Sequence, residues 1–358
     1  MQWRPEYGRF PLPGGGGMEN ISRPLLTVCE LGRIGDIIAS EPIYRYLREH
    51  YPDRLIRWYT RPLYAELLKF SPWIDEVEIV ADAAEYLKRK AELPAGTLSF
   101  ELNFRYTEEG RRRNGKTVPG ALPSLLEQFA VAAGLPPLDE TPVFHFAPNV
   151  TTPPLPERYF VFHCTSQGRA RQWPPSKWNA LAEHFFAAGT HVVEIGLAPV
   201  IRSGNPLYTD LTGRRSLQEV GRVVAQSAGL IGVDSGFSHM ANATGTFGVI
   251  ITGRLRNQPG FNPYSGSFRR GENANLVRFY DELAVRGPVS LAAAVSDRLI
   301  AGNPMSGAEC EIFCLTEQIR RARSHWWRRL AALPRRLYDR IQTTLILHWS
   351  KHRPGGCA

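Results

Sequence analysis

Short apolar runs that alternate with helix-like segments constrain the fold of this 358-residue chain more than any other feature. One block spans residues 25–80, where LLTVCEL, RLIRWYT and IDEVEIV are strand-like and the segments between them have helical patterns. A second block spans residues 159–253 and contains YFVFHC, THVVEIG, AGLIGVD and FGVIITG. Strand–helix alternation of this kind predicts parallel strands with right-handed crossovers. The sequence therefore predicts an α/β protein with two doubly wound, Rossmann-like domains.

A proline-rich stretch without periodicity, Ala147–Arg158, separates the two blocks and is typical of a linker. The N-terminal residues lack the apolar core of a secretion signal, and we expect a flexible leader in which Met18 could be the true start. No apolar run reaches the roughly 20 residues that span a bilayer. The expected organisation is a leader (1–23), an N-terminal domain (24–147), a linker (148–157), a C-terminal domain (158–323) and a tail (324–358).

The positive charge of the chain is concentrated near its C-terminus. The formal net charge is +9, and residues 320–353 contain ten Arg or Lys and one acidic residue. The remainder is close to neutral, which argues against a nucleic-acid groove. From Trp326 to Trp349 apolar residues recur every three or four positions beside arginines, a pattern typical of basic amphipathic helices on anionic membranes. We expect the chain to pack up to about Arg323 and then to contact the membrane, the alternative being a terminal helix packed on the first domain.

The five cysteines have no disulfide-framework spacing, which favours a reducing, cytoplasmic location. Cys310 and Cys314 lie one helical turn apart without a second pair, so a zinc site is not expected.

The segment GRIGD, residues 32–36, lies where the first strand gives way to a helix. Glycine permits a sharp turn and close approach to a ligand, and Gly35 is expected to make this turn. The N–H groups of the following helix favour an anion. Asp36 could accept a proton from an attacking hydroxyl, or it could cap the helix, and the two roles are compatible.

The segment IGVDSGFSHMANATG places Asp234 at the end of a buried strand, with Ser235 and Gly236 opening the next helix. Small residues here let backbone amides approach a phosphate. His239 follows Ser235 by four residues, so we expect both to project from one side and His239 to reach a pyrophosphate. The alternative is a histidine buried in the core.

The segment FHCTSQGRARQW places two hydroxyls, Thr165 and Ser166, after another strand. Arg169 and Arg171 then offer cations suited to a diphosphate, the alternative being a solvated basic loop. Trp173 and Trp178 are expected to serve packing.

Four segments together resemble glycosyltransferase family 9, the heptosyltransferase-like enzymes of bacterial lipopolysaccharide assembly. They are GRIGDIIASEP, QWPPSKWNALAEHF, DLTGRRSLQEVGRVVAQSAGLIGVDSGFSHMANATG and CLTEQI, in this order between Leu25 and Ile319. The resemblance implies a GT-B fold, in which two Rossmann-like domains face a cleft and bind the acceptor and the nucleotide sugar respectively. It also implies inverting transfer without metal or cofactor, usually from ADP-heptose.

By this resemblance Asp36 matches the general base, and Arg171 matches the basic residue before the Trp-Pro pair. The donor-binding turn is matched by Asp234, Ser235, Gly236 and His239. Arg215 falls in the region near the base or ribose of the donor. Family members commonly carry an acidic, glycine-rich stretch after the strand VVEIG, whereas LAPVIRSGNPLY has no carboxylate, so no glutamate contact to the donor is assigned.

A glycine-bounded loop of the first domain carries a cluster of cations, Arg111, Arg112, Arg113 and Lys116. This cluster fits either a solvated loop or the binding of an anionic, phosphorylated glycolipid acceptor. Two other functions fit the predicted fold: a sugar-nucleotide epimerase acting on free nucleotide sugar, and a non-catalytic, membrane-associated binding protein.

Overall fold

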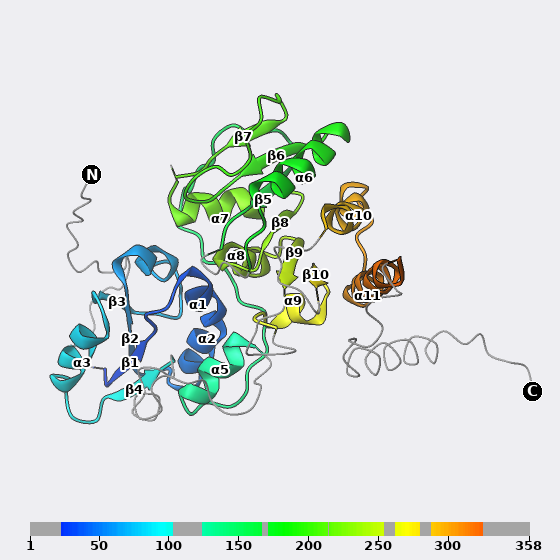
Figure 1. Cartoon of the computed structure of the whole chain (residues 1–358). Helices are drawn as coiled ribbons and strands as arrows, with labels where there is room; N and C mark the ends of the chain where they lie inside the picture. The colour runs from blue at the N-terminus through cyan, green and yellow to red at the C-terminus, as the bar shows by residue number, and fades with distance from the viewer. Residues whose placement is uncertain are drawn as a thin grey trace, which may run out of the picture. The chain divides into compact units, whose positions relative to one another are not determined.

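The computed structural model describes residues 23–102, 124–166, 171–213, 215–253, 262–279 and 288–324. The chain divides between Val150 and Thr151 into two compact units, which are called unit 1 and unit 2 (Figure 1). The boundary lies within the proline-rich stretch 147–158.

Unit 1 contains a parallel four-stranded sheet with the order β3-β2-β1-β4. Its strands are β1 (Leu25–Cys29), β2 (Leu55–Thr60), β3 (Glu76–Ile79) and β4 (Leu98–Glu101). Its helices are α1 (Ile34–Ala39), α2 (Glu41–His50), the 3-10 helix η1 (Pro62–Leu67), α3 (Ala83–Ala91) and α5 (Leu125–Ala132). Helices α1, α2 and α5 contact one another beside the sheet (Figure 1). In the core, the buried rings of Tyr44 and Trp58 meet edge to face at 4.2 Å.

The helical pattern after β1 forms two helices rather than one continuous helix. Helix α1 ends at Ala39 and α2 begins at Glu41, with Ser40 between them. Pro42 has no N–H to continue the α1 hydrogen-bond ladder, and the Ser40 hydroxyl donates to the Ile37 carbonyl at 2.9 Å. The break follows from the missing backbone donor.

Unit 2 contains a parallel six-stranded sheet with the order β7-β6-β5-β8-β9-β10. Its strands are β5 (Tyr159–His163), β6 (His191–Glu194), β7 (Tyr208–Asp210), β8 (Leu230–Val233), β9 (Gly248–Gly253) and β10 (Ala274–Phe279). Its helices are α6 (Pro175–Ala187), α7 (Leu217–Ala225), α8 (Gly236–Thr244), α9 (Gly266–Arg270), α10 (Val289–Ile300) and α11 (Gly307–Ser324). Trp173 and Trp178 are buried and pack edge to face at 5.2 Å, which confirms their predicted packing role.

In each sheet the first strand lies between the second strand and the fourth. In unit 1 β1 separates β2 from β4, and in unit 2 β5 separates β6 from β8. The crossovers therefore leave the first strand in opposite directions, which makes a topological switch point between β1 and β4 in unit 1 and between β5 and β8 in unit 2. This switch point is where doubly wound sheets bind ligands. The residues that follow β1, β5 and β8 are therefore the candidates for ligand binding.

Helix α11 packs on unit 2. Cys310 and Cys314 are buried, the Cys310 thiol lies 3.9 Å from the Leu276 carbonyl, and Gln318 Nε2 donates to the Arg278 carbonyl at 2.8 Å. The prediction that the chain packs before the tail is confirmed for this part of α11, which lies against β10. The amphipathic pattern after residue 324 lies outside the described residues. None of the described helices combines the length and the apolar content needed to span a bilayer.

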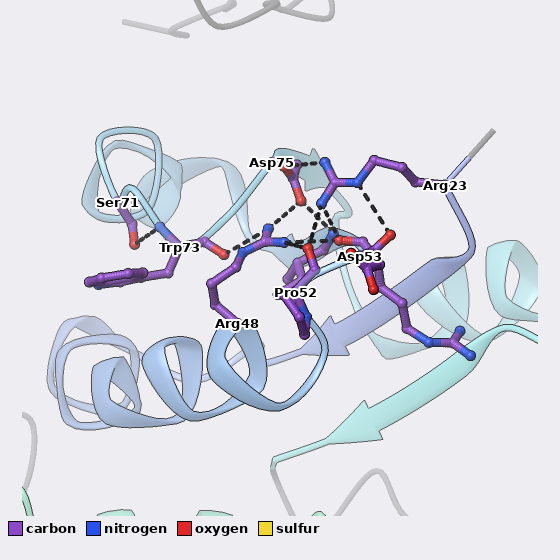
Figure 2. Close-up of polar contacts among 9 residues, drawn as sticks. Arg23, Arg48, Pro52, Asp53, Ser71, Trp73 and Asp75 are labelled. Carbon is purple, nitrogen blue, oxygen red and sulfur yellow. Dashed lines mark hydrogen bonds and ion pairs between the residues drawn. The ribbon is translucent and has the colours of Figure 1, made fainter. Parts of the chain in front are cut away.

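An ion-pair cluster fastens the amino ends of the unit 1 strands (Figure 2). The Asp75 carboxylate contacts Arg23 Nη1 at 3.0 Å, accepts the Ile56 N–H at 2.7 Å and also pairs with Arg48. Arg48 donates further to the Trp73 carbonyl at 3.3 Å. Burial alone would raise the pKa of Asp75, but the hydrogen bonds from Ile56, Arg48 and Arg23 outweigh it and lower the pKa. The cluster is remote from the carboxyl edge and serves stability.

Candidate active site

The carboxylate of Asp36 lies directly on the backbone of the turn after β1. Asp36 is the third residue of α1, it is half-buried, and its Oδ2 accepts the Arg33 N–H at 2.7 Å. It therefore caps the helix from inside its first turn rather than from the N-cap position, which Arg33 occupies. Among the described residues, Oδ1 accepts no hydrogen bond. One oxygen holds the side chain in place and the other is available to a proton.

A close approach in this turn falls on Gly32. Gly35 is the second residue of α1, inside the helix. A Cβ at Gly32 would lie 2.6 Å from Oδ2 of Asp36 and 2.6 Å from Oε1 of Glu30. The Gly32 N–H also donates to Glu30 at 2.5 Å. The structure thus moves the glycine turn from Gly35 to Gly32, since only glycine leaves room for both carboxylates.

At the carboxyl end of β8, Asp234 holds Arg171 in place. Asp234 is 6% exposed, and its Oδ2 accepts from Arg171 Nη1 at 2.9 Å. Its Oδ1 lies 3.0 Å from the hydroxyl of Tyr264, which is also 2.8 Å from Ser238 Oγ. Burial raises the pKa of Tyr264 well above its ordinary value, so this ring stays a neutral partner. Asp234 therefore contributes through Arg171, whose Nε and Nη2 donate no hydrogen bond within the described ranges.

Ser235 pairs with a residue that the sequence did not single out. Its Oγ lies 2.9 Å from Nδ1 of His163, the last residue of β5. His163 is 4% exposed, and burial lowers the pKa of His163 to about 3. The indication in the sequence is that His163 is a polar residue at the end of the otherwise apolar run YFVFH. The pair brings the ends of β5 and β8 together at the unit 2 switch point.

The predicted hydroxyl of Thr165 lies close to this pair. A Cβ at Gly196, in the turn after β6, would lie 3.9 Å from Thr165 Oγ1 and 3.7 Å from Nε2 of His163. Thr165 and His163 therefore flank the same point. Ser166 is buried, and its carbonyl accepts from Gln172 Nε2.

His239 takes the buried position that was the alternative for it. It is 4% exposed, and its ring lies 4.7 Å from that of Tyr264 at 47°. Ser235 Oγ is paired with His163, and the expectation that His239 reaches a pyrophosphate from the side of Ser235 stays a prediction. Gly236 is the first residue of α8 and leaves the helix N-terminus without a side chain.

Arg215 precedes α7, and its guanidinium pairs with Glu219 at 3.1 Å. Glu219 also accepts the Ser216 N–H at 2.9 Å, and the two contacts lower its pKa. Arg215 is thus held at the start of α7, after the carboxyl end of β7.

A glutamate does precede the loop that lacks carboxylates. Glu194, the last residue of β6, is 1% exposed and accepts the Val200 and Ile201 N–H groups at 2.8 and 3.1 Å. It also accepts the Tyr208 hydroxyl at 2.7 Å. Burial raises the pKa of Glu194 despite these bonds. Its carboxylate is committed to shaping the loop.

The acceptor cluster Arg111, Arg112, Arg113 and Lys116 lies outside the described residues, as does Arg169. Within the described ranges, no group of three or more His, Cys, Asp or Glu side chains is arranged to hold a metal ion.

The unit 2 edge has the chemistry of an anion site. It gathers the Arg171 guanidinium, the Ser235 and Thr165 hydroxyls and the N-terminus of α8, whose N–H groups and dipole favour negative charge. The unit 1 edge offers a fixed carboxylate instead. The first arrangement suits a phosphorylated ligand, and the second suits removal of a proton from a hydroxyl.

Comparison with protein families supports this assignment. Residues 140–254 match the model of glycosyltransferase family 9 (heptosyltransferase). No curated protein sequence matches the chain significantly.

Three solved structures share the fold over most of this chain. A family 9 glycosyl transferase from Veillonella parvula DSM 2008 has a TM-score of 0.61 and 15% identity over 79% of this chain and 99% of its own. The E. coli ADP-heptose lps heptosyltransferase II has a TM-score of 0.60 and 16% identity over 78% and 99%. E. coli heptosyltransferase WaaC, solved with ADP, has a TM-score of 0.55 and 18% identity over 78% and 99%. The two Rossmann-like units of the expected GT-B fold and the family resemblance are confirmed, and the cleft between the units stays a prediction.

Proposed function

We propose that this chain, a heptosyltransferase-like glycosyltransferase of the family 9 type, transfers heptose from ADP-heptose. The acceptor would be the lipopolysaccharide core or a related glycolipid. The observation that carries the proposal is the gathering of Arg171, Ser235 and the α8 N-terminus at the unit 2 switch point. Support for ADP-heptose comes from E. coli WaaC, which was solved with ADP and with a fluorinated ADP-heptose.

The proposed reaction inverts the configuration of the transferred sugar. Asp36 accepts the proton of the acceptor hydroxyl while the oxygen of that hydroxyl attacks the anomeric carbon of the donor from the face opposite the diphosphate. The bond between that carbon and the diphosphate oxygen breaks, and ADP leaves with the electron pair. Arg171 and the α8 N–H groups stabilise the charge that develops on the diphosphate. The expectation that no metal or cofactor is required stays a prediction.

The acceptor side is proposed from the sequence. Arg111, Arg112, Arg113 and Lys116 would bind phosphates of an anionic glycolipid, and the basic tail after residue 324 would hold the enzyme at the cytoplasmic face of the inner membrane. Vesicle co-sedimentation tests the tail: deletion of 325–358 should weaken binding to anionic vesicles.

The donor is tested by a thermal-shift series with ADP-heptose, UDP-glucose and GDP-mannose, followed by a transfer assay on a heptose-deficient lipopolysaccharide core. A ligand that binds only the folded state raises the melting temperature by mass action, and ADP-heptose should raise it most. Epimerisation of free ADP-heptose without acceptor would favour the epimerase. Stabilisation without any turnover would favour a binding protein. Stabilisation by another nucleotide sugar alone would contradict the ADP-heptose assignment.

A further inference from the structure

The pair formed by His163 and Ser235 joins the two central strands of the unit 2 sheet. His163 ends β5 and lies in register with Gly232 of β8, two residues before Asp234. Ser235 is the N-cap of α8, and its Oγ lies 2.9 Å from Nδ1 of His163. A side chain from the first strand thus fixes a hydroxyl that the fourth strand delivers to the same edge.

The imidazole of His163 is held on two sides. The Phe237 ring lies 4.5 Å away at 50°, and a Cβ at Gly196 would lie 3.6 Å from Cδ2 of the imidazole. The side chain is almost completely buried, and its pKa of about 3 keeps the ring neutral over the working range of an enzyme. A neutral imidazole carries a single N–H, so its two nitrogens have different roles.

The direction of the hydrogen bond decides what Ser235 can offer a ligand. If the serine hydroxyl donates to Nδ1, its oxygen presents only lone pairs, which repel an anion. If Nδ1–H donates to the serine oxygen, the hydroxyl proton is free to point elsewhere. The oxygens of a nucleotide diphosphate are acceptors only, so this ligand favours the second arrangement.

We propose that His163 is a positioning residue that donates its Nδ1–H to Ser235 Oγ and so directs the serine proton to the diphosphate of the donor. The inference rests on the proposed function and adds a residue to its donor site. It involves no transfer of a proton to or from His163. His163 acts entirely through Ser235.

Two substitutions at position 163 separate this role from packing. His163→Phe keeps a planar ring between Phe237 and Gly196 but removes the donor. His163→Asn loses the ring, yet its amide N–H₂ takes approximately the place of Nδ1–H. His191→Phe is the matched control, because His191 also contacts a hydroxyl, Thr209 Oγ1 at 2.8 Å, but it begins β6 at the opposite edge of the sheet.

Initial rates against donor concentration, with ADP titration calorimetry and melting temperatures for every variant, test the proposal. His163→Phe should lower kcat/KM for the donor and weaken ADP binding about tenfold, as expected for one hydrogen bond to a charged group. His163→Asn should recover most of this loss despite its smaller side chain, and His191→Phe should match the wild type. Ser235→Ala should lose as much as His163→Phe, and the double variant should lose no more.

The proposal is overturned if His163→Phe matches the wild type, if Asn is no better than Phe, or if the losses at 163 and 235 multiply. If His163→Phe does not fold, His163→Asn is compared with Ser235→Ala instead. The proposal then requires that His163→Asn binds ADP more tightly than Ser235→Ala. Failure of the proposed function has a different signature, since the wild-type protein itself would then neither bind ADP nor transfer heptose.

Discussion

In unit 1 the first strand lies between β2 and β4, and in unit 2 its counterpart β5 lies between β6 and β8. The two switch points have the same topology but carry opposite chemistry. The residues after β1 present a carboxylate fixed by a backbone N–H and by the absence of a side chain at Gly32. The residues after β5 and β8 present the Arg171 guanidinium, held by Asp234, and the Ser235 hydroxyl, held by His163. One topology thus supplies a basic carboxylate on one unit and an anion site on the other.

The two edges also differ in how their functional groups are supported. Asp36 is held within its own turn, by residues no more than four positions away. In unit 2 the support comes from distant segments, since Arg171 and Asp234 are 63 residues apart and His163 and Ser235 are 72 apart. The carboxylate of unit 1 is thus held by a local motif, whereas the guanidinium and the hydroxyl of unit 2 depend on segments that only the folded sheet brings together.

The largest effect is expected at the carboxylate of unit 1. Asp36→Asn keeps the shape of the side chain but removes its basicity, so transfer should fall by about 10²–10⁴-fold while ADP binding stays unchanged. Steady-state rates and calorimetry measure the two quantities. Asp53→Asn, in the exposed turn before β2, is the control and should retain full activity. Transfer within tenfold of wild type would remove Asp36 as the base.

The turn that holds Asp36 gives the next largest effect. Gly32→Ala places a methyl group 2.6 Å from Asp36 Oδ2, so the carboxylate must shift, and a displacement of about 1 Å can cost a hundredfold in rate. We expect kcat to fall by about this factor. Gly204→Ala is the matched control, because a Cβ there meets nothing within 4 Å. Equal rates for the two variants would show that the close approach at Gly32 has no part in catalysis.

A substitution in the anion site of unit 2 should weaken ADP binding and not only lower the rate of transfer. Arg171→Gln removes the cation that Asp234 orients and should weaken ADP binding about tenfold or more. The exposed Arg298→Gln on α10 serves as control, with no change expected. Calorimetric titration with ADP at constant salt measures the affinity of both variants. Unaltered affinity in Arg171→Gln would contradict the assignment of the donor site to unit 2.

The smallest effect is on stability. Asp75→Asn weakens the cluster at the amino edge of unit 1 and should cost about 1–2 kcal/mol of unfolding free energy without changing ADP affinity. Because folding lowers the pKa of Asp75, its contribution is complete above the ordinary value of 3.8 and is lost as pH falls through the lower, folded-state pKa. Denaturant unfolding at pH 7 and in acid should show the difference between wild type and variant shrinking in acid. A constant difference would contradict the linkage.

Much of the fold could be predicted because the strands are apolar runs punctuated by glycine and proline. The runs containing β1, β2, β3, β5, β6, β8 and β9 were all recognised, most of them because buried parallel strands need continuous apolar residues. The break between α1 and α2 was missed although Pro42 signalled it. Strands β4, β7 and β10 were not identified, because their half-buried or short sequences lack a clear run.

The site was harder to predict than the fold, and the reason is sequence separation. Asp36, Arg171, Asp234 and Ser235 were singled out because each follows a predicted strand, and their roles stay predictions. The partners that hold them were not. Nothing near His163 indicates a serine 72 residues later, because the pairing of β5 with β8 arises only from strand order. Gly32 was passed over in favour of Gly35 because two glycines flank one turn, and only the path of the backbone distinguishes them.

The central claim is that unit 2 holds the nucleotide diphosphate and unit 1 supplies the base. Hydrogen–deuterium exchange of the wild-type protein with and without saturating ADP tests it most directly, because bound ligand slows the exchange of the amides it covers. The account predicts slower exchange in peptides covering 163–166 and 234–240, with the amides of 30–40 far less affected. Protection confined to 30–40, with the ends of β5 and β8 unchanged, would contradict it.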